Sequence, residues 1–232
     1  MNYPEISVIK NLYDGLIFDL DGTLLDSMNL WTQADVSFLS KRGFEVTPDY
    51  TDYVKSVSIE DAAQYTKDRF NLPDSIQDII DEWNAFVGRG YRETVPLKSG
   101  AKEYLLCAHK AGFKIGCATA LTRPNTNAVL KRCGVYDLFD TILTLDDIKG
   151  CPDKRHPDIY LKTSAAIGTL PSRTLVFEDV PLAAKGATTG GFDVCAIFDI
   201  VGVGSIHSWE QMAKECRFST QSWIPTKCTY IK

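Results

Sequence analysis

The feature that most constrains the fold is a short apolar run that leads directly into two aspartates. In the stretch LIFDLDGTLLDS, at residues 16–27, three apolar residues precede Asp19, and Asp21 follows one residue later. A continuous apolar run bounded by Gly15 is typical of a strand that is buried inside a parallel sheet. Because acids buried without partners are costly, the stretch predicts that Asp19 and Asp21 bind something at the end of this strand.

From residue 95 onward, strand patterns alternate with helix patterns. Short β-rich runs occur at residues 113–119, 141–145, 174–178 and 192–198. Helical patterns occur at residues 101–111, 124–133, 157–167 and 181–188. Such alternation indicates right-handed βαβ units, so we predict a doubly wound, Rossmann-like α/β core with helices on both faces of a parallel sheet. Residues after about 218 show no clear pattern.

Residues 28–94 have a different character, with helical periodicity and no convincing strand. The pattern is strongest near residues 76–91, where apolar side chains recur at helical spacing. We therefore predict an all-helical cap domain at 28–94, inserted into a core domain made of residues 1–27 and 95–232.

Composition restricts the class of protein. The 232 residues carry a net charge of -5, so no basic surface for nucleic acid or an anionic membrane is expected. The seven cysteines include no CxxC pair, which argues against a disulfide framework and against structural zinc. Neither a signal peptide nor an eighteen-residue apolar window is evident, so we expect a cytoplasmic protein. Nothing suggests a self-pairing surface, and we expect a monomer.

Acidic residues stand where the predicted strands end. Asp19 and Asp21 follow the first strand, and Glu178 and Asp179 come at the end of the run at 174–178. The carboxyl ends of parallel strands meet at one edge, where such sheets bind their ligands. Carboxylates gathered there repel one another unless a cation neutralises them, and hard oxygen ligands select Mg²⁺.

Two further polar residues suit a phosphate ester as the guest of such a magnesium site. Thr119 ends the second predicted strand, and Lys154 follows the strand pattern at 141–145 after a loop. A hydroxyl and an ammonium group can both bind phosphate oxygens. Taken singly, Thr119 is as well explained as a β-former and Lys154 as a surface lysine, so only their order and placement indicate a site.

In this order the segments resemble the haloacid dehalogenase (HAD) superfamily, within it the phosphatase/β-phosphoglucomutase-like group with a helical cap. The resemblance is carried by DLDGTLLDS at 19–27, ATA at 118–120, Lys154 ahead of PDIYL at 157–161, and VFEDVPLAAKGA from Val176. It extends from about residue 14 to residue 213, nearly the whole chain.

The resemblance implies roles for the four acids. Asp19 would be the nucleophile that forms an aspartyl-phosphate, and Asp21 the general acid and then the general base. Mg²⁺ would be held by Asp19, the Asp21 backbone carbonyl and Asp179, with Glu178 as a direct or indirect ligand. Thr119 and Lys154, by the same resemblance, would bind the phosphoryl oxygens.

The expected function is therefore that of a Mg²⁺-dependent phosphatase acting on a small phosphorylated metabolite. Two alternatives stay open: a β-phosphoglucomutase-like phosphosugar mutase, and a catalytically inactive HAD domain used for regulation. Mutases of the group carry a histidine in the cap, whereas this chain has none before His109. The lysine motif, usually K-P-x-P, is here Lys154-Arg155-His156-Pro157, so this loop departs from the pattern of the family. The sequence does not identify the substrate.

Overall fold

The computed structural model describes residues 3–54, 57–151 and 153–223, which form two compact units. One unit is formed by described residues within 1–28 and 95–232, and the other by residues within 29–94. The chain leaves the first unit just after its first strand and returns to it at Val95. The second unit is therefore a single contiguous insertion.

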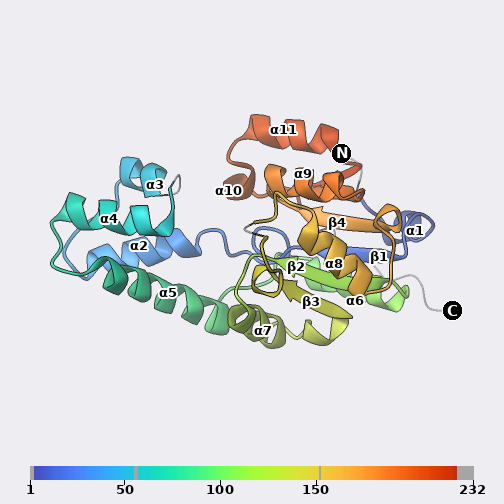
Figure 1. The fold of residues 1–232 in the computed structure, drawn as a ribbon, viewed down its shortest axis with the longest axis horizontal. Helices are drawn as coiled ribbons and strands as arrows, with labels where there is room; N and C mark the ends of the chain where they lie inside the picture. Colours follow the sequence, from blue (N-terminus) through green and yellow to red (C-terminus); the bar gives the residue numbers. More distant parts are fainter. Residues whose placement is uncertain (1–2, 55–56, 152, 224–232) are drawn as a thin grey trace. The chain divides into compact units, whose positions relative to one another are not determined.

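The first unit is built on a six-stranded sheet with the strand order β3-β2-β1-β4-β5-β6 (Figure 1). Every neighbouring pair is parallel, which confirms the doubly wound α/β fold. The strands are β1 (Gly15–Phe18), β2 (Lys114–Thr119), β3 (Thr141–Thr144), β4 (Thr174–Glu178), β5 (Asp193–Ile197) and β6 (Phe218–Thr220).

The strand order places the helices on two faces. From β1 the chain moves outward through β2 to β3, then crosses back to β4 and moves outward in the other direction. Right-handed crossovers therefore put α6 and α7 on one face and α8 and α9 on the other. The helices of this unit are α1 (Ile6–Ile9), α6 (Ala101–Lys110), α7 (Arg123–Arg132), α8 (Asp158–Ala166), α9 (Pro181–Thr189), α10 (Ile200–Val203) and α11 (Ile206–Glu215).

Each face of the sheet has its own apolar core. On the face covered by α6, Phe18 of β1 stacks on Phe177 of β4 with ring centroids 4.4 Å apart, and Tyr104 of α6 packs edge-on against both. On the opposite face, Ile17 and Val176 pack with buried side chains of α8, α9 and α11. Burying one such side chain stabilises the fold by roughly 1.5–3 kcal/mol.

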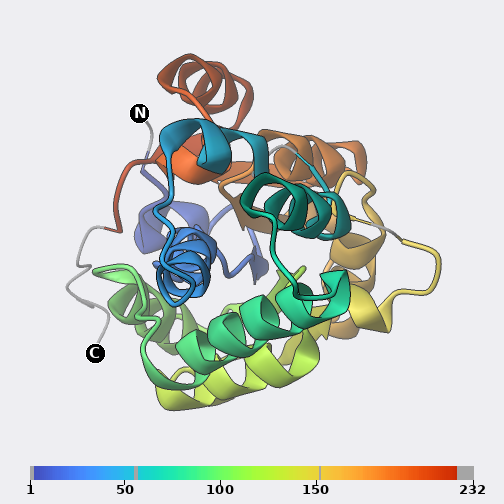
Figure 2. The same ribbon diagram turned by 90° about the vertical axis from the view of Figure 1, so that its left-hand side faces the viewer.

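The second unit is all-helical, as predicted. Its helix α5 begins at a capping box between Ser75 and Asp78, and its buried stripe includes Ile79, Trp83 and Val87. Helix α5 packs against both α2 and α4 (Figure 2). The helices are α2 (Leu30–Ser40), α3 (Pro48–Val54), α4 (Ile59–Phe70) and α5 (Ile76–Glu93).

The sequence analysis did not predict helices α1, α3, α10 and α11, strand β6 or a disulfide. Helix α3 is short, with only Tyr50 buried among its residues, and so carries little periodicity. Strand β6 lies in the stretch without clear pattern, and three residues are too few to show one. The cysteine pattern argued against a disulfide framework, and this prediction was wrong at Cys107, which is disulfide-bonded.

Within the described residues, no helix is both long and apolar enough to cross a membrane.

Gly116 in β2 permits the close approach of α8 that the core requires. A Cβ atom at this position would lie 2.4 Å from Thr163 Cγ2. We expect Gly116→Ala to lower the free energy of unfolding by about 1–3 kcal/mol, measured by urea denaturation. Adding Thr163→Ser should recover most of the loss, because serine lacks Cγ2 but keeps the hydroxyl that donates to Ile159 O at 2.7 Å. Equal stability of the single and double variants would contradict this packing argument.

Candidate active site

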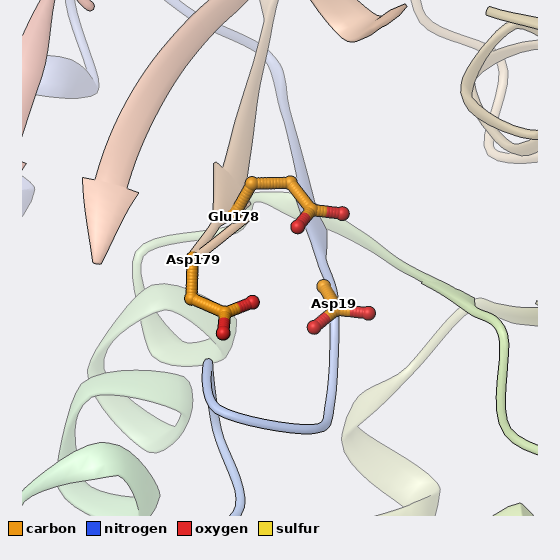
Figure 3. Close-up of side chains that lie close together, drawn as sticks. All are labelled: Asp19, Glu178 and Asp179. Carbon is orange, nitrogen blue, oxygen red and sulfur yellow. The ribbon is translucent and has the colours of Figure 1, made fainter. Parts of the chain in front are cut away.

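Three buried carboxylates meet where the two central strands end. Phe18 of β1 pairs with Phe177 of β4, so the residues that follow, Asp19 and Glu178, emerge side by side at the carboxyl edge of the sheet. Asp179 comes next in the chain. One oxygen from each of these three acids lies within 4.8 Å of the others, and the side chains turn toward a common space (Figure 3). The register of the sheet therefore concentrates negative charge at one point.

Lys154 brings a positive charge into this cluster. Its ammonium contacts Asp19 Oδ1 and donates to Glu178 Oε1 at 2.5 Å. The side chain is only 11% exposed, although it comes from the loop between β3 and α8. That loop packs closely on Gly186 of α9, where a Cβ atom would lie 2.2 Å from the Lys154 carbonyl oxygen. The unusual residues after Lys154 thus do not prevent it from reaching the site.

Burial and charge repulsion together shift the ionisation of these groups. Burial raises the pKa of Glu178 and of Asp179 above the usual carboxyl range, and the negative charge of Asp19 raises both further. The Lys154 ammonium opposes both of these upward pKa shifts. Burial disfavours the charged form of Lys154 itself, but Asp19 and Glu178 outweigh this and raise its pKa. The cluster therefore stabilises any positive charge placed beside it.

The donor set fits a hard divalent cation. Glu178 Oε2 and Asp179 Oδ2 are buried and lack a hydrogen-bond partner among the described residues. Such atoms are rare in folded proteins because an unsatisfied buried acceptor is costly. A cation held by Asp19, Glu178 and Asp179 would satisfy both atoms with the oxygen ligands that such ions prefer.

Asp21 and Thr119 stand near this edge on neighbouring segments. Asp21 lies on the turn after β1, is partly exposed, and its Oδ1 accepts from Ser27 Oγ at 2.6 Å. Thr119 is buried at the end of β2, and its Oγ1 accepts from the Leu121 amide at 3.1 Å. That bond leaves the threonine O–H as a donor. All six residues singled out in the sequence thus lie at or near the carboxyl edge of this one sheet.

Two residues that the sequence analysis did not single out also act on the acidic residues of the site. Tyr160 of α8 donates to Glu178 Oε1 at 2.7 Å. Lys98 pairs with Asp199 at 2.9 Å, just after β5, and its charge opposes the rise that burial and the neighbouring acids cause in the pKa of Asp179. A tyrosine on the sheet-facing side of an apolar helix is predicted to be a core residue, so the sequence pattern gave no sign of the hydrogen bond that Tyr160 makes.

Comparison with known proteins fits this geometry. Residues 16–197 match the family model described as haloacid dehalogenase-like hydrolase. The chain belongs to this family. It is therefore a hydrolase of the HAD type. The three acids of the cluster and Lys154 lie at the carboxyl edge of its sheet.

Relatives of this HAD hydrolase include enzymes named for phosphate chemistry. Hexitol phosphatase B of Escherichia coli is 27% identical over 168 residues, 70% of this chain and 73% of that protein. A phosphorylated carbohydrates phosphatase of Thermotoga maritima is 24% identical, with 78% and 82% covered. The solved structure of a putative β-phosphoglucomutase from Thermotoga maritima superposes with a TM-score of 0.80 at 19% identity, covering 90% and 95%. The last likeness supports the fold.

The buried ion pairs of Lys154 allow a test of the electrostatics. Lys154→Met should lower the free energy of unfolding by about 3–5 kcal/mol in EDTA, because it leaves Asp19 and Glu178 uncompensated. Urea denaturation at neutral pH measures this. Arg155→Met is the matched control, since Arg155 is exposed and pairs with the neighbouring Asp153. Equal losses in the two variants would mean that the buried charges are not held by Lys154.

Gly22 allows a second test, directed at the position of Asp179. Its φ is +75°, and a Cβ atom would lie 2.2 Å from Asp179 Oδ2. Gly168 has a φ of +73° with nothing within 4 Å of its Cβ position, so it carries the same backbone cost, roughly 1–2 kcal/mol, without the contact. We expect Gly22→Ala to weaken Mn²⁺ binding by about tenfold in an electron paramagnetic resonance titration. The control variant Gly168→Ala should bind Mn²⁺ as the wild type does. Unchanged Mn²⁺ binding in Gly22→Ala would contradict the placement of Asp179 at the cation site.

Proposed function

We propose that this HAD hydrolase is a Mg²⁺-dependent phosphatase of a small phosphorylated metabolite, a sugar phosphate or a similar compound. The observation that carries the proposal is the contact of the Lys154 ammonium with Asp19 beside the acidic cluster. A nucleophilic carboxylate, a cation site and a positive group for phosphate oxygens then lie together. Phosphoryl transfer requires this combination of charge neutralisation and positioning.

The names of the relatives support a carbohydrate-like substrate. Besides the hexitol and phosphorylated carbohydrates phosphatases, a validoxylamine A 7'-phosphate phosphatase of Streptomyces hygroscopicus is 26% identical over 206 residues. These names share a polyol or sugar-like body with a phosphate ester. The net charge of -5 means that attraction of such an anion must come from local positive charge, that of Lys154 together with a cation bound by the acids.

The reaction divides into two displacements at phosphorus. A carboxylate oxygen of Asp19 forms a bond to phosphorus while the bond from phosphorus to the ester oxygen breaks, and Asp21 gives its proton to the departing alcohol. Asp21 then takes a proton from a water molecule that attacks the aspartyl-phosphate, and the Asp19–phosphorus bond breaks. Inorganic phosphate leaves, and both aspartates return to their starting states.

The remaining residues hold the reactants in place. Lys154 keeps Asp19 oriented and binds a phosphoryl oxygen, while Thr119 donates its O–H to another. Asp19, Asp179 and the backbone carbonyl of Asp21 would hold Mg²⁺, with Glu178 as a direct or indirect ligand. Bound Mg²⁺ supplies positive charge that offsets the negative charge of the phosphoryl oxygens.

We assign residues 28–94 as a cap domain and residues 1–27 with 95–232 as the catalytic core. The division of the described residues into two compact units supports this assignment. A cap limits the entry of water during the first displacement and contributes side chains that choose the metabolite.

Phosphate release is the direct test of the function. Wild-type protein with Mg²⁺ is assayed against a panel of hexose, hexitol and pentose phosphates, beside Asp19→Asn. We expect the wild type to release inorganic phosphate and Asp19→Asn to lose at least a thousandfold in rate, because an amide is a far poorer nucleophile than a carboxylate. EDTA should abolish release, and excess Mg²⁺ should restore it.

The outcomes that contradict the proposal point to its alternatives. An isomerised sugar phosphate with no inorganic phosphate would identify a mutase. Full activity of Asp19→Asn would exclude the aspartyl-phosphate route. No turnover across the panel by folded, Mg²⁺-loaded protein would favour a regulatory HAD domain.

A further inference from the structure

A tyrosine behind the acidic cluster is the strongest feature that the proposed chemistry leaves unused. Tyr160 is fully buried in α8, and its hydroxyl donates to Glu178 Oε1 at 2.7 Å. The Lys154 ammonium donates to the same oxygen at 2.5 Å. Both donors therefore meet on one oxygen of a carboxylate that is itself completely buried.

The other oxygen of this carboxylate is left unsatisfied. Glu178 Oε2 has no hydrogen-bond partner among the described residues, and neither has Asp179 Oδ2. Figure 3 shows Glu178, Asp179 and Asp19 around a common space. Two donors on one oxygen and none on the other give the carboxylate a fixed orientation, with one oxygen for Lys154 and one for the cation site.

The hydroxyl, rather than the ring, is what this arrangement requires. The ring belongs to the apolar core that also contains Ile159 and Phe192, and a phenylalanine would fill the same volume. A buried hydroxyl stabilises only where it is hydrogen-bonded, and here the acceptor is Glu178. Burial and the neighbouring carboxylate raise the pKa of Tyr160 well above its usual value, so the phenol remains a donor.

We infer that Tyr160 is a positioning residue whose hydroxyl holds Glu178 Oε1 against Lys154 and so keeps Glu178 Oε2 directed to the cation site. The inference rests on the proposed function, because it assigns that site to a cation. Without the hydroxyl, Glu178 Oε1 keeps Lys154 as a donor but loses Tyr160, so the carboxylate plane can tilt and its free oxygen can move away from the cation site.

Removal of the single oxygen atom tests this role. We expect Tyr160→Phe to raise the Kd for Mg²⁺ by about 10- to 100-fold, measured by isothermal titration calorimetry without substrate. Tyr13→Phe is the matched control, because the buried Tyr13 hydroxyl donates to Asp193 Oδ2 at 2.5 Å at the opposite edge of the sheet. That variant should bind Mg²⁺ as the wild type does. An unchanged Kd in Tyr160→Phe would overturn the inference.

A double-mutant cycle separates positioning from a general structural effect. If Tyr160 acts through Glu178, then adding Tyr160→Phe to Glu178→Gln should change the Kd by less than about twofold. An equal loss in both backgrounds would overturn the inference, as would a Tyr160→Phe chain that fails to fold beside a folded Tyr13→Phe.

The titration also separates this inference from the proposed activity. Because no substrate is present, weakened binding in Tyr160→Phe supports the positioning role even where no phosphate release is found. Wild-type protein that binds no Mg²⁺ would overturn the positioning role together with the cation site.

Discussion

The meeting of three buried carboxylates beside one buried ammonium is the constraint on which the rest of the site depends. The parallel register of β1 and β4 makes it unavoidable, because Asp19 and Glu178 leave adjacent strands at the same level. Lys154 neutralises part of the charge, and two carboxylate oxygens still lack partners among the described residues. The fold therefore builds a place where a cation is stabilising, and the cost of burying the acids is offset when one binds.

The position of this cluster follows from the topology of the sheet. The connections leave β1 in one direction and β4 in the other, so the chain diverges between the two central strands. Open α/β sheets bind their ligands at such a point. The backbone also closes tightly there: Cβ atoms at Gly22 and Gly202 would lie 2.2 Å and 1.9 Å from Asp179 Oδ2. The turn after β1 and helix α10 thus confine one carboxylate oxygen.

Much of this could be predicted from the sequence, because strand ends are visible in the pattern. The run at 174–178 matches β4, which fixed the positions of Glu178 and Asp179. What the pattern could not show depends on tertiary contact. Tyr160 follows the apolar periodicity of α8, so its polar role appears only when the helix is placed behind Glu178. Strand β6 is defined by its pairing with β5, in which Phe218 lies opposite Cys195, and its own short sequence does not predict a strand.

The charge balance of the site also implies an order of binding. Asp19 and Glu178 contact the ammonium of Lys154, Asp179 lies in the same cluster, and the protein as a whole is acidic. A phosphate ester approaching this edge without a cation meets repulsion that grows stronger as burial lowers the local dielectric. A divalent cation held by Asp19, Glu178 and Asp179 would reverse the sign of the interaction for at least part of the site. In the proposed phosphatase, the acidic cluster would thus bind its cation before the phosphate ester, whose negative charge that cation would offset.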